Sequence, residues 1–217
     1  MRAKVIVASN RASAGVYEDR GGPILVEGLR ALGFEVGDPH VVPDGEPVHE
    51  ALTAALADDP DVILTSGGTG LTAGDLTPEM TRRVLDREVP GVAEAIRAYG
   101  LAKGVPAAML SRGLAGLAGR TLVVNLPGTR GGCRDGLAVL EPVLQHAIDQ
   151  VAGVDHSASG TDQVESGAHV GRGAERHGHG HGGHGRGGHG RGPDASPSEP
   201  APRRERDRPD ALRVDTD

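Results

Sequence analysis

A glycine-rich loop between two regular elements constrains this chain more than any other feature. The apolar residues 61–64 are typical of a buried strand, and Thr77 followed by Pro78 predicts a helix capped by Thr77. Between them, residues 65–76 contain four glycines, several hydroxyl side chains and Asp75. Glycines let a backbone approach a ligand and turn its N–H groups towards an anion. This succession predicts a ligand site at the carboxyl end of a strand in an α/β sheet, with an ordinary βα turn as the alternative.

Strand-like and helix-like segments alternate over the first 150 residues. The segments expected to form strands are 4–8, 34–42, 62–65, 107–114 and 120–125. The segments expected to form helices are 23–32, 46–57, 77–87, 91–99 and 136–151. Because strands and helices alternate with short connections, we predict an α/β fold, a three-layer sandwich with a mostly parallel sheet.

The chain divides into two regions of different composition. Residues 1–152 have the usual size of one globular domain. From residue 155 onward there is one leucine and no isoleucine or aromatic residue, and 11 of the 22 residues 171–192 are glycine. Burial of so few apolar groups cannot offset the entropy of ordering the chain, so residues 153–217 are expected to form a disordered tail.

Charge and composition exclude several classes of protein. The net charge is −7, and the chain contains one phenylalanine, two tyrosines and no tryptophan. It therefore lacks the basic surface and the stacking aromatic residues of a nucleic-acid binder. The single Cys133 cannot form an internal disulfide. The apolar run in residues 1–7 is too short for a signal peptide and no segment reaches the ~20 apolar residues of a membrane span, so a soluble cytoplasmic protein is expected.

Four loops that follow predicted strands are expected to meet at one edge of the sheet, since parallel strands point their carboxyl ends the same way. Two of these loops are rich in glycine, and two contain acids, Asp44 and Asp75. Carboxylates suit Mg²⁺ and glycine-loop N–H groups suit phosphate, so we predict a site for a phosphate-bearing ligand with Mg²⁺. No P-loop motif is present. The candidate binding residues besides the two acids are Ser9, Ser66, Gly67, Gly68, Thr69, Gly70, Ser111, Asn125, Pro127 and Gly128.

Several of these residues have a simpler interpretation. Asp44 stands in a Pro-Asp-Gly sequence that turn formation alone explains, and Asp75 could be a solvated or helix-capping acid. Ser111 with Arg112 could bind an anion or lie on the surface of an edge strand. The sequence shows no evident general base for Cys133, so we interpret this cysteine as a packing residue.

The tail contains a second possible site. Five histidines separated mainly by glycine could chelate Ni²⁺, Zn²⁺ or Cu²⁺ through neutral imidazoles, or could belong to a low-complexity linker. They are His177, His179, His181, His184 and His189.

Six blocks of sequence, in order, resemble one known family. The blocks are residues 9–19, 42–44, 65–79, 86–91, 109–112 and 124–128. Together they are similar to the molybdopterin-binding family of molybdenum-cofactor biosynthesis, of the MogA/MoaB type, over residues 1–152. The resemblance implies a molybdopterin adenylyltransferase, which transfers AMP from Mg-ATP to the terminal phosphate of molybdopterin and releases pyrophosphate. It further implies that the enzyme is a homotrimer and that a molybdate insertase uses its product.

The resemblance also implies roles for particular residues. Asp44 and Asp75 are the functional acids, the loop 66–70 holds phosphate or pterin, and residues 125–128 line the same pocket. The chain departs from the family pattern at Asn10, where relatives often have aspartate, and at residues 73–74, where they commonly have Pro-Arg. Two alternatives stay open: a paralogue that binds molybdopterin with weak catalysis, and a metal-binding or scaffold protein that acts through its tail.

Overall fold

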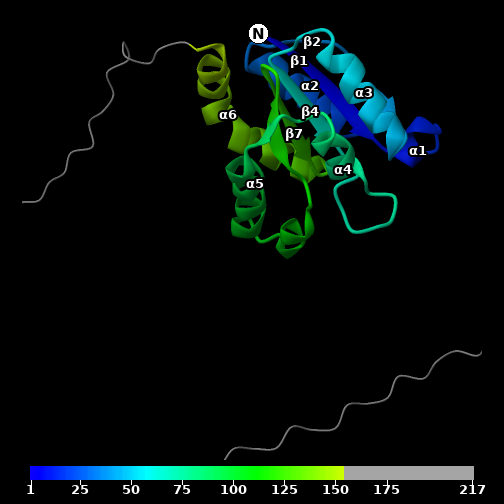
Figure 1. The fold of residues 1–217 in the computed structure, drawn as a ribbon. Helices are drawn as coiled ribbons and strands as arrows, with labels where there is room; N and C mark the ends of the chain where they lie inside the picture. The colour runs from blue at the N-terminus through cyan, green and yellow to red at the C-terminus, as the bar shows by residue number, and fades with distance from the viewer. Residues whose placement is uncertain (154–217) are drawn as a thin grey trace, which may run out of the picture. The chain divides into compact units, whose positions relative to one another are not determined.

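The centre of the fold is a seven-stranded, mostly parallel sheet in a computed structural model that describes residues 1–153 (Figure 1). The parallel strands are β1, β2, β3, β4 and β7, and β6 and β5 join antiparallel at one edge. In spatial order the strands are β2 (Glu35–Val36), β1 (Arg2–Ala8), β4 (Val62–Ser66), β7 (Thr121–Leu126), β6 (Ala115–Ala118) and β5 (Arg87–Glu88), with β3 (His40–Val42) also beside β1.

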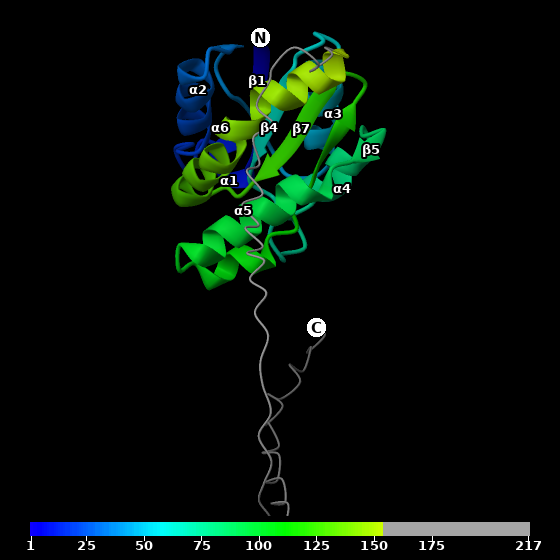
Figure 2. The same cartoon turned by 90° about the vertical axis from the view of Figure 1, so that its left-hand side faces the viewer.

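Helices cover both faces of the sheet, which completes three layers and confirms the predicted fold class (Figure 2). One face is covered by α2 (Gly22–Ala31), α5 (Pro90–Ala102) and α6 (Arg130–Ala152). The other is covered by α3 (Glu46–Leu56) and α4 (Thr77–Arg82). Two short elements, α1 (Asn10–Ser13) and the 3-10 helix η1 (Pro106–Leu110), lie in connections. No helix among the described residues is long and apolar enough to cross a membrane.

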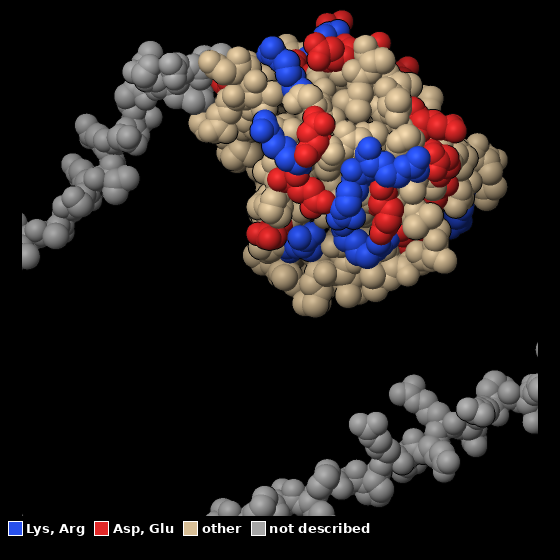
Figure 3. Space-filling model, viewed as in Figure 1, with Lys and Arg blue, Asp and Glu red and all other residues tan. Residues whose placement is uncertain are grey.

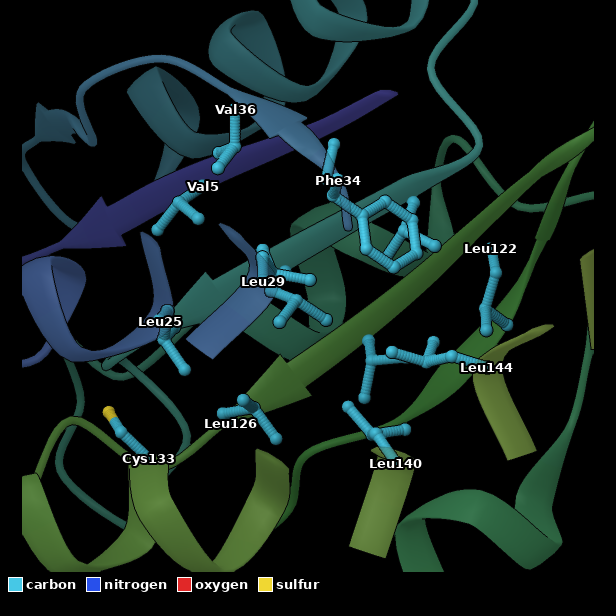
Figure 4. Packing of buried hydrophobic residues seen from close by; sticks show 14 of the residues in the cluster. Val5, Leu25, Leu29, Phe34, Val36, Leu122, Leu126, Cys133, Leu140 and Leu144 are labelled. Atoms are coloured by element: carbon cyan, nitrogen blue, oxygen red, sulfur yellow. The ribbon is translucent and has the colours of Figure 1, made fainter. Parts of the chain in front are cut away.

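The hydrophobic core has two parts, one on each face of the sheet. Successive side chains of β1 point to opposite faces, so Val5 packs with α2 and α6 whereas Ile6 packs with α3. Figure 4 shows the first part, in which Leu25 of α2 and Leu140 of α6 face the central strands. Burial on both faces explains why the central strands correspond to continuous apolar runs in the sequence.

Several predicted elements are wrong in extent or type. The single strand expected at 34–42 is two short strands, β2 and β3, because Gly37-Asp38-Pro39 interrupts the pairing and proline has no N–H to donate. The helix expected at 77–87 ends at Arg82, and the chain then forms β5. The strand expected at 107–114 is η1 followed by a loop, and β6 begins only afterwards.

The last helix begins six residues before its predicted start at 136. Thr129 caps it, because the Thr129 Oγ1 atom accepts a hydrogen bond of 3.0 Å from the Gly132 N–H. The helix ends at Ala152, and its C-cap residue Gly153 has a φ of 72°, the left-handed geometry that favours glycine. The predicted tail beyond Gly153, with the five histidines proposed as metal ligands, lies outside the described residues.

The visible surface of the described region mixes charges of both signs. On the face in Figure 3, adjoining lysine and arginine side chains near the middle of the described region are bordered by aspartate and glutamate side chains. The described region also contains exposed ion pairs, among them Lys4–Asp58 and Arg83–Glu46.

Candidate functional site

The four loops that follow β1, β3, β4 and β7 meet at the carboxyl edge of the sheet. The Ser9 N–H donates to the Val42 carbonyl across 2.9 Å, which joins the first loop to the second. The Gly67 N–H donates to the Leu126 carbonyl across 3.1 Å, which joins the third to the fourth. These two hydrogen bonds join positions that are 33 and 59 residues apart in the sequence.

Asp44 is fixed by the loop after β1. Its Oδ2 atom accepts a hydrogen bond of 3.1 Å from the Asn10 N–H, and its own N–H donates to Asn10 Oδ1, also across 3.1 Å. Burial raises the pKa of the Asp44 carboxyl, the negative charge of Asp75 raises it further, and the Asn10 hydrogen bond acts in the opposite direction. The two predicted acids are thus close enough to influence one another electrostatically.

Two glycines of the loop after β4 have backbone geometries that other residues rarely adopt. The φ angles are 96° at Gly67 and 60° at Gly68. A Cβ atom at Gly67 would collide with the Ala8 carbonyl oxygen. One at Gly68 would collide with the Thr77 hydroxyl and lie 2.8 Å from Asp44 Oδ1. Glycine is therefore required at both positions, because surrounding atoms approach too closely to leave room for a Cβ atom.

Asp75 is held by hydrogen bonds within its own loop. Its Oδ2 atom accepts from the Thr72 N–H at 2.9 Å and from the Thr72 hydroxyl at 2.6 Å. Its carbonyl oxygen accepts from the guanidinium of Arg112, which also forms an ion pair with Glu79. The sequence suggests Arg112 only as a possible anion ligand or a surface residue and does not suggest Glu79 at all, because these contacts join positions 37 and 33 residues apart.

Thr77 begins α4 but does not cap it. The N-cap residue is Leu76, and no side chain provides a capping hydrogen bond, so the predicted role of Thr77 is wrong. The Thr77 Oγ1 atom is buried and has no hydrogen-bond partner among the described residues. It lies instead beside Gly68, on the side where Asp44 Oδ1 also approaches.

The oxygen atoms in this region fit a magnesium ion. Asp44, Asp75 and the unpartnered Thr77 hydroxyl are hard donors, and Mg²⁺ is commonly held by one or two carboxylates together with substrate phosphates. Within residues 1–153, no group of three or more His, Cys, Asp or Glu side chains could hold a metal alone. A magnesium ion at the two acids would therefore need further oxygen ligands, from water or from a substrate.

Two cavities open at this edge of the sheet. The first, called here the loop cavity, has a volume of about 370 Å³ and is lined by Ser9, Ser66, Gly67 and Gly128, with cationic side chains at Arg20 and Arg130. Tyr17 also lines it and is flanked by the guanidinium groups of Arg11 and Arg20, 5.4 Å and 5.3 Å from the ring centroid. Asp19 lines the same cavity, where its carboxylate accepts from the Gly21 and Gly22 N–H groups. Two arginines against this one acid still favour an anionic ligand.

The second cavity, called here the α5 cavity, has a volume of about 560 Å³. Four candidate residues line it: Thr69, Gly70, Ser111 and Pro127. Its remaining wall comes largely from apolar side chains of α5 and η1, including Ile96 and Leu110. Thr129 lines both cavities, whereas Asp44 and Asp75 line neither.

Asn125 and Cys133 lie inside the protein. The Asn125 carboxamide donates to the hydroxyls of Thr65 and Thr81, each across 2.9 Å, and accepts from the Leu114 N–H at 3.3 Å. Both of its N–H groups are therefore bonded within the fold. Cys133 is fully buried, and burial raises the pKa of its thiol, as expected for a packing residue.

Known proteins match the described region over most of its length. The model of a family described as a probable molybdopterin binding domain matches residues 4–146. A molybdopterin adenylyltransferase from Helicobacter pylori (strain J99) is 36% identical over 153 residues, which cover 69% of this chain and 86% of that protein. A molybdenum cofactor biosynthesis bifunctional protein from Chlorobaculum tepidum is 39% identical over 158 residues, 72% of this chain, and the match spans half of its length.

The solved structures agree with this result. The molybdopterin biosynthesis Mog protein from Mycobacterium ulcerans has a TM-score of 0.66 and 54% sequence identity, over 69% of this chain and 98% of that one. The fold, the paired acids beside a glycine-rich loop and these matches lead to one assignment. The chain belongs to the molybdopterin-binding family of molybdenum-cofactor biosynthesis, of the MogA/MoaB type.

Proposed function

We propose that this protein is a molybdopterin adenylyltransferase, which transfers AMP from Mg-ATP to the terminal phosphate of molybdopterin. The observation that carries the proposal is the placement of Asp44 beside Gly68 and of Asp75 beside Gly70 in the same glycine-rich loop, close enough for the charge of Asp75 to raise the pKa of Asp44. The name of the Helicobacter pylori relative supports the same activity.

The reaction needs positioning and charge neutralisation rather than a protein nucleophile. An oxygen of the molybdopterin phosphate forms a bond to the α-phosphorus of ATP, and the bond from that phosphorus to the bridging oxygen breaks, which releases pyrophosphate. Asp44 and Asp75 would hold Mg²⁺, which when bound neutralises charge on the phosphate oxygens. Asn10 orients Asp44, and the Thr72 N–H and hydroxyl orient Asp75.

The two cavities suit different parts of the substrates. The loop cavity, with the Ser9 and Ser66 side chains and two arginines, suits phosphate groups. The α5 cavity has largely apolar walls and suits a flat heterocycle. Because Thr129 lines both, groups bound in the two cavities would lie next to one another.

The direct test is conversion of purified molybdopterin to its AMP derivative, with ATP and Mg²⁺ each omitted in parallel reactions. The proposal expects equal amounts of the adenylylated product and pyrophosphate, and neither when ATP or Mg²⁺ is absent. Release of phosphate or pyrophosphate without the AMP derivative would overturn it.

A molybdopterin-binding paralogue with weak catalysis is the second candidate. Asn10 favours this candidate, because it contacts Asp44 directly and stands at a position where relatives often have aspartate. Isothermal titration separates the two candidates. Tight binding of molybdopterin with AMP transfer far slower than binding would support the paralogue.

The remaining expectations concern the setting of the enzyme. We propose a cytoplasmic homotrimer that passes its product to a molybdate insertase. Exposed apolar side chains on α5 and near η1, among them Leu101, Val105 and Met109, offer a surface for association of copies. Light scattering coupled to gel filtration tests the trimer, and a monomeric mass would refute it.

A further inference from the structure

Arg112 lies between η1 and β6 and reaches back to the glycine-rich loop. Its Nε atom donates to the Gly70 carbonyl at 2.7 Å, one Nη donates to the Asp75 carbonyl, and the other forms an ion pair with Glu79. Its backbone N–H also donates to the Thr69 carbonyl at 2.9 Å. One residue thus contacts the start, the middle and the end of the segment 69–79.

We propose that Arg112 is a positioning residue for AMP transfer, which holds residues 69–79 in one arrangement and so fixes Asp75 relative to Asp44. This inference rests on the proposed function. Arg112 lines neither the loop cavity nor the α5 cavity, so it acts through the loop rather than by contact with substrate.

The electrostatics of the Arg112–Glu79 pair support a specific ion pair between these two side chains. Burial acts to raise the pKa of the Glu79 carboxyl. The hydrogen bond and positive charge of Arg112, a backbone hydrogen bond and the charge of Arg82 together outweigh it, so the pKa is below its ordinary value. Glu79 therefore stays ionised at neutral pH and keeps the guanidinium in place.

The geometry of the contacts requires a guanidinium. Three separate acceptors are bonded by three different nitrogen atoms of Arg112, and a planar fork can satisfy them together. A lysine carries the same charge on one nitrogen and cannot reach all three acceptors. Arg112→Lys therefore separates the role of the charge from the role of the fork.

The first experiment compares steady-state kinetics of Arg112→Lys and Arg112→Ala. Loss of the fixed loop should lower kcat about 100-fold in both variants, because small displacements of catalytic groups cost about that much. The KM for ATP should change by less than about threefold, since Arg112 lines neither cavity. The matched controls are Arg30→Lys and Arg30→Ala, because Arg30 donates through two nitrogens to the Val36 carbonyl, and Val36 pairs with Ala3 at the start of β1, the end of the strand opposite to the site.

The second experiment measures amide hydrogen exchange without substrate. The Asp75 N–H bonds to the Thr72 carbonyl and the Thr77 N–H to the Gly68 carbonyl, so both report on the loop. Their exchange should accelerate about tenfold in Arg112→Lys, while β4 and β7 keep their protection and show that the fold is intact.

Each result has a definite meaning. Wild-type kcat in Arg112→Lys would overturn the proposal, because charge alone would then suffice, and so would unchanged loop exchange in a variant with low kcat. An inactive wild-type protein would instead refute the proposed function. In that case loop exchange still decides whether Arg112 holds the segment.

Discussion

Asn10 and Asp44 exchange two hydrogen bonds, each 3.1 Å long, across 34 residues of sequence. In each bond, the side chain of one residue accepts from the backbone N–H of the other. This reciprocal pair joins the loop after β1 to the loop after β3 and fixes the carboxylate that the proposed reaction needs.

The first prediction concerns Asn10→Ala. This change removes the acceptor for the Asp44 N–H, so it should lower the free energy of unfolding by about 0.5–1.5 kcal/mol. Turnover should fall by more than the smaller fraction of folded protein accounts for, because the Asn10 side chain no longer holds the Asp44 backbone in place. Urea denaturation and the AMP-transfer assay measure the two effects. Asn10→Asp is the control: it keeps an acceptor oxygen but adds a negative charge beside Asp44, so it should recover stability relative to Asn10→Ala at high salt, which screens the repulsion. No recovery at high salt would argue against the hydrogen bond.

The second prediction concerns Asp75→Asn. The asparagine oxygen can still accept from Thr72, so the fold should survive while the charge beside Mg²⁺ is lost. Turnover should fall on the order of 10²–10³-fold at saturating Mg²⁺, and molybdopterin binding should be affected less. Turnover near that of the wild type would show that Asp75 takes no part in the mechanism, and Asp44 would be the one remaining candidate acid.

The third prediction concerns the pH dependence of stability at Asp44. Its pKa in the folded protein is raised above the ordinary value of 3.8, so ionisation of Asp44 costs folding free energy. The contribution of Asp44 to stability is therefore fully present below pH 3.8 and is lost as pH rises through the raised pKa. Asp44→Asn cannot ionise and avoids this loss.

Denaturation of Asp44→Asn and of the wild type between pH 3 and pH 7, without Mg²⁺, tests the sign. The stability of the variant relative to the wild type should increase with pH and become constant near neutrality. A relative stability that decreases with pH would show that the Asp44 pKa is lowered in the folded protein.

The fourth prediction compares two glycines of the same loop. Gly67→Ala places a Cβ atom against the Ala8 carbonyl at a φ of 96°, so it should cost about 1–3 kcal/mol or more of stability. Gly74→Ala has its nearest neighbouring atom at 3.9 Å and should change stability by less than about 0.5 kcal/mol. Thermal unfolding of both variants provides the comparison, and equal effects would contradict it.

The fifth prediction concerns Asn125. Replacement by alanine leaves the hydroxyls of Thr65 and Thr81 and the Leu114 N–H without their partner. Each buried polar group left unpaired costs about 1–3 kcal/mol, so the ligand-free protein should be strongly destabilised. Unchanged ligand-free stability, with molybdopterin binding lost, would instead support direct contact between Asn125 and substrate.

The sequence predicts the architecture well because the buried strands carry their signal locally. Every residue of β4 is buried, and the apolar run 62–64 at its start is visible in the sequence without knowledge of its neighbours. Prediction is poorer where pairing is short: β2 and β5 have two residues each, too few for a pattern to distinguish them from loops.

The site is predictable only in part, for a related reason. Glycine-rich loops and acids are visible in the sequence, but whether a polar side chain faces a cavity or the interior depends on distant residues. The Asn125 carboxamide bonds to hydroxyls 60 and 44 residues away. The contacts of Arg112 with the glycine-rich loop likewise appear only after the chain has folded.

Thr129 links local helix formation to the shape of two cavities. Its hydroxyl caps α6, and the same residue forms part of the wall of both cavities. Serine could keep the cap, whereas an apolar residue would remove it at a cost of about 1 kcal/mol, and either change would reshape both cavities at once. Under the proposed assignment of the cavities to different parts of the substrates, specificity for one part alone can evolve only through residues that line a single cavity, such as Leu110 or Arg20.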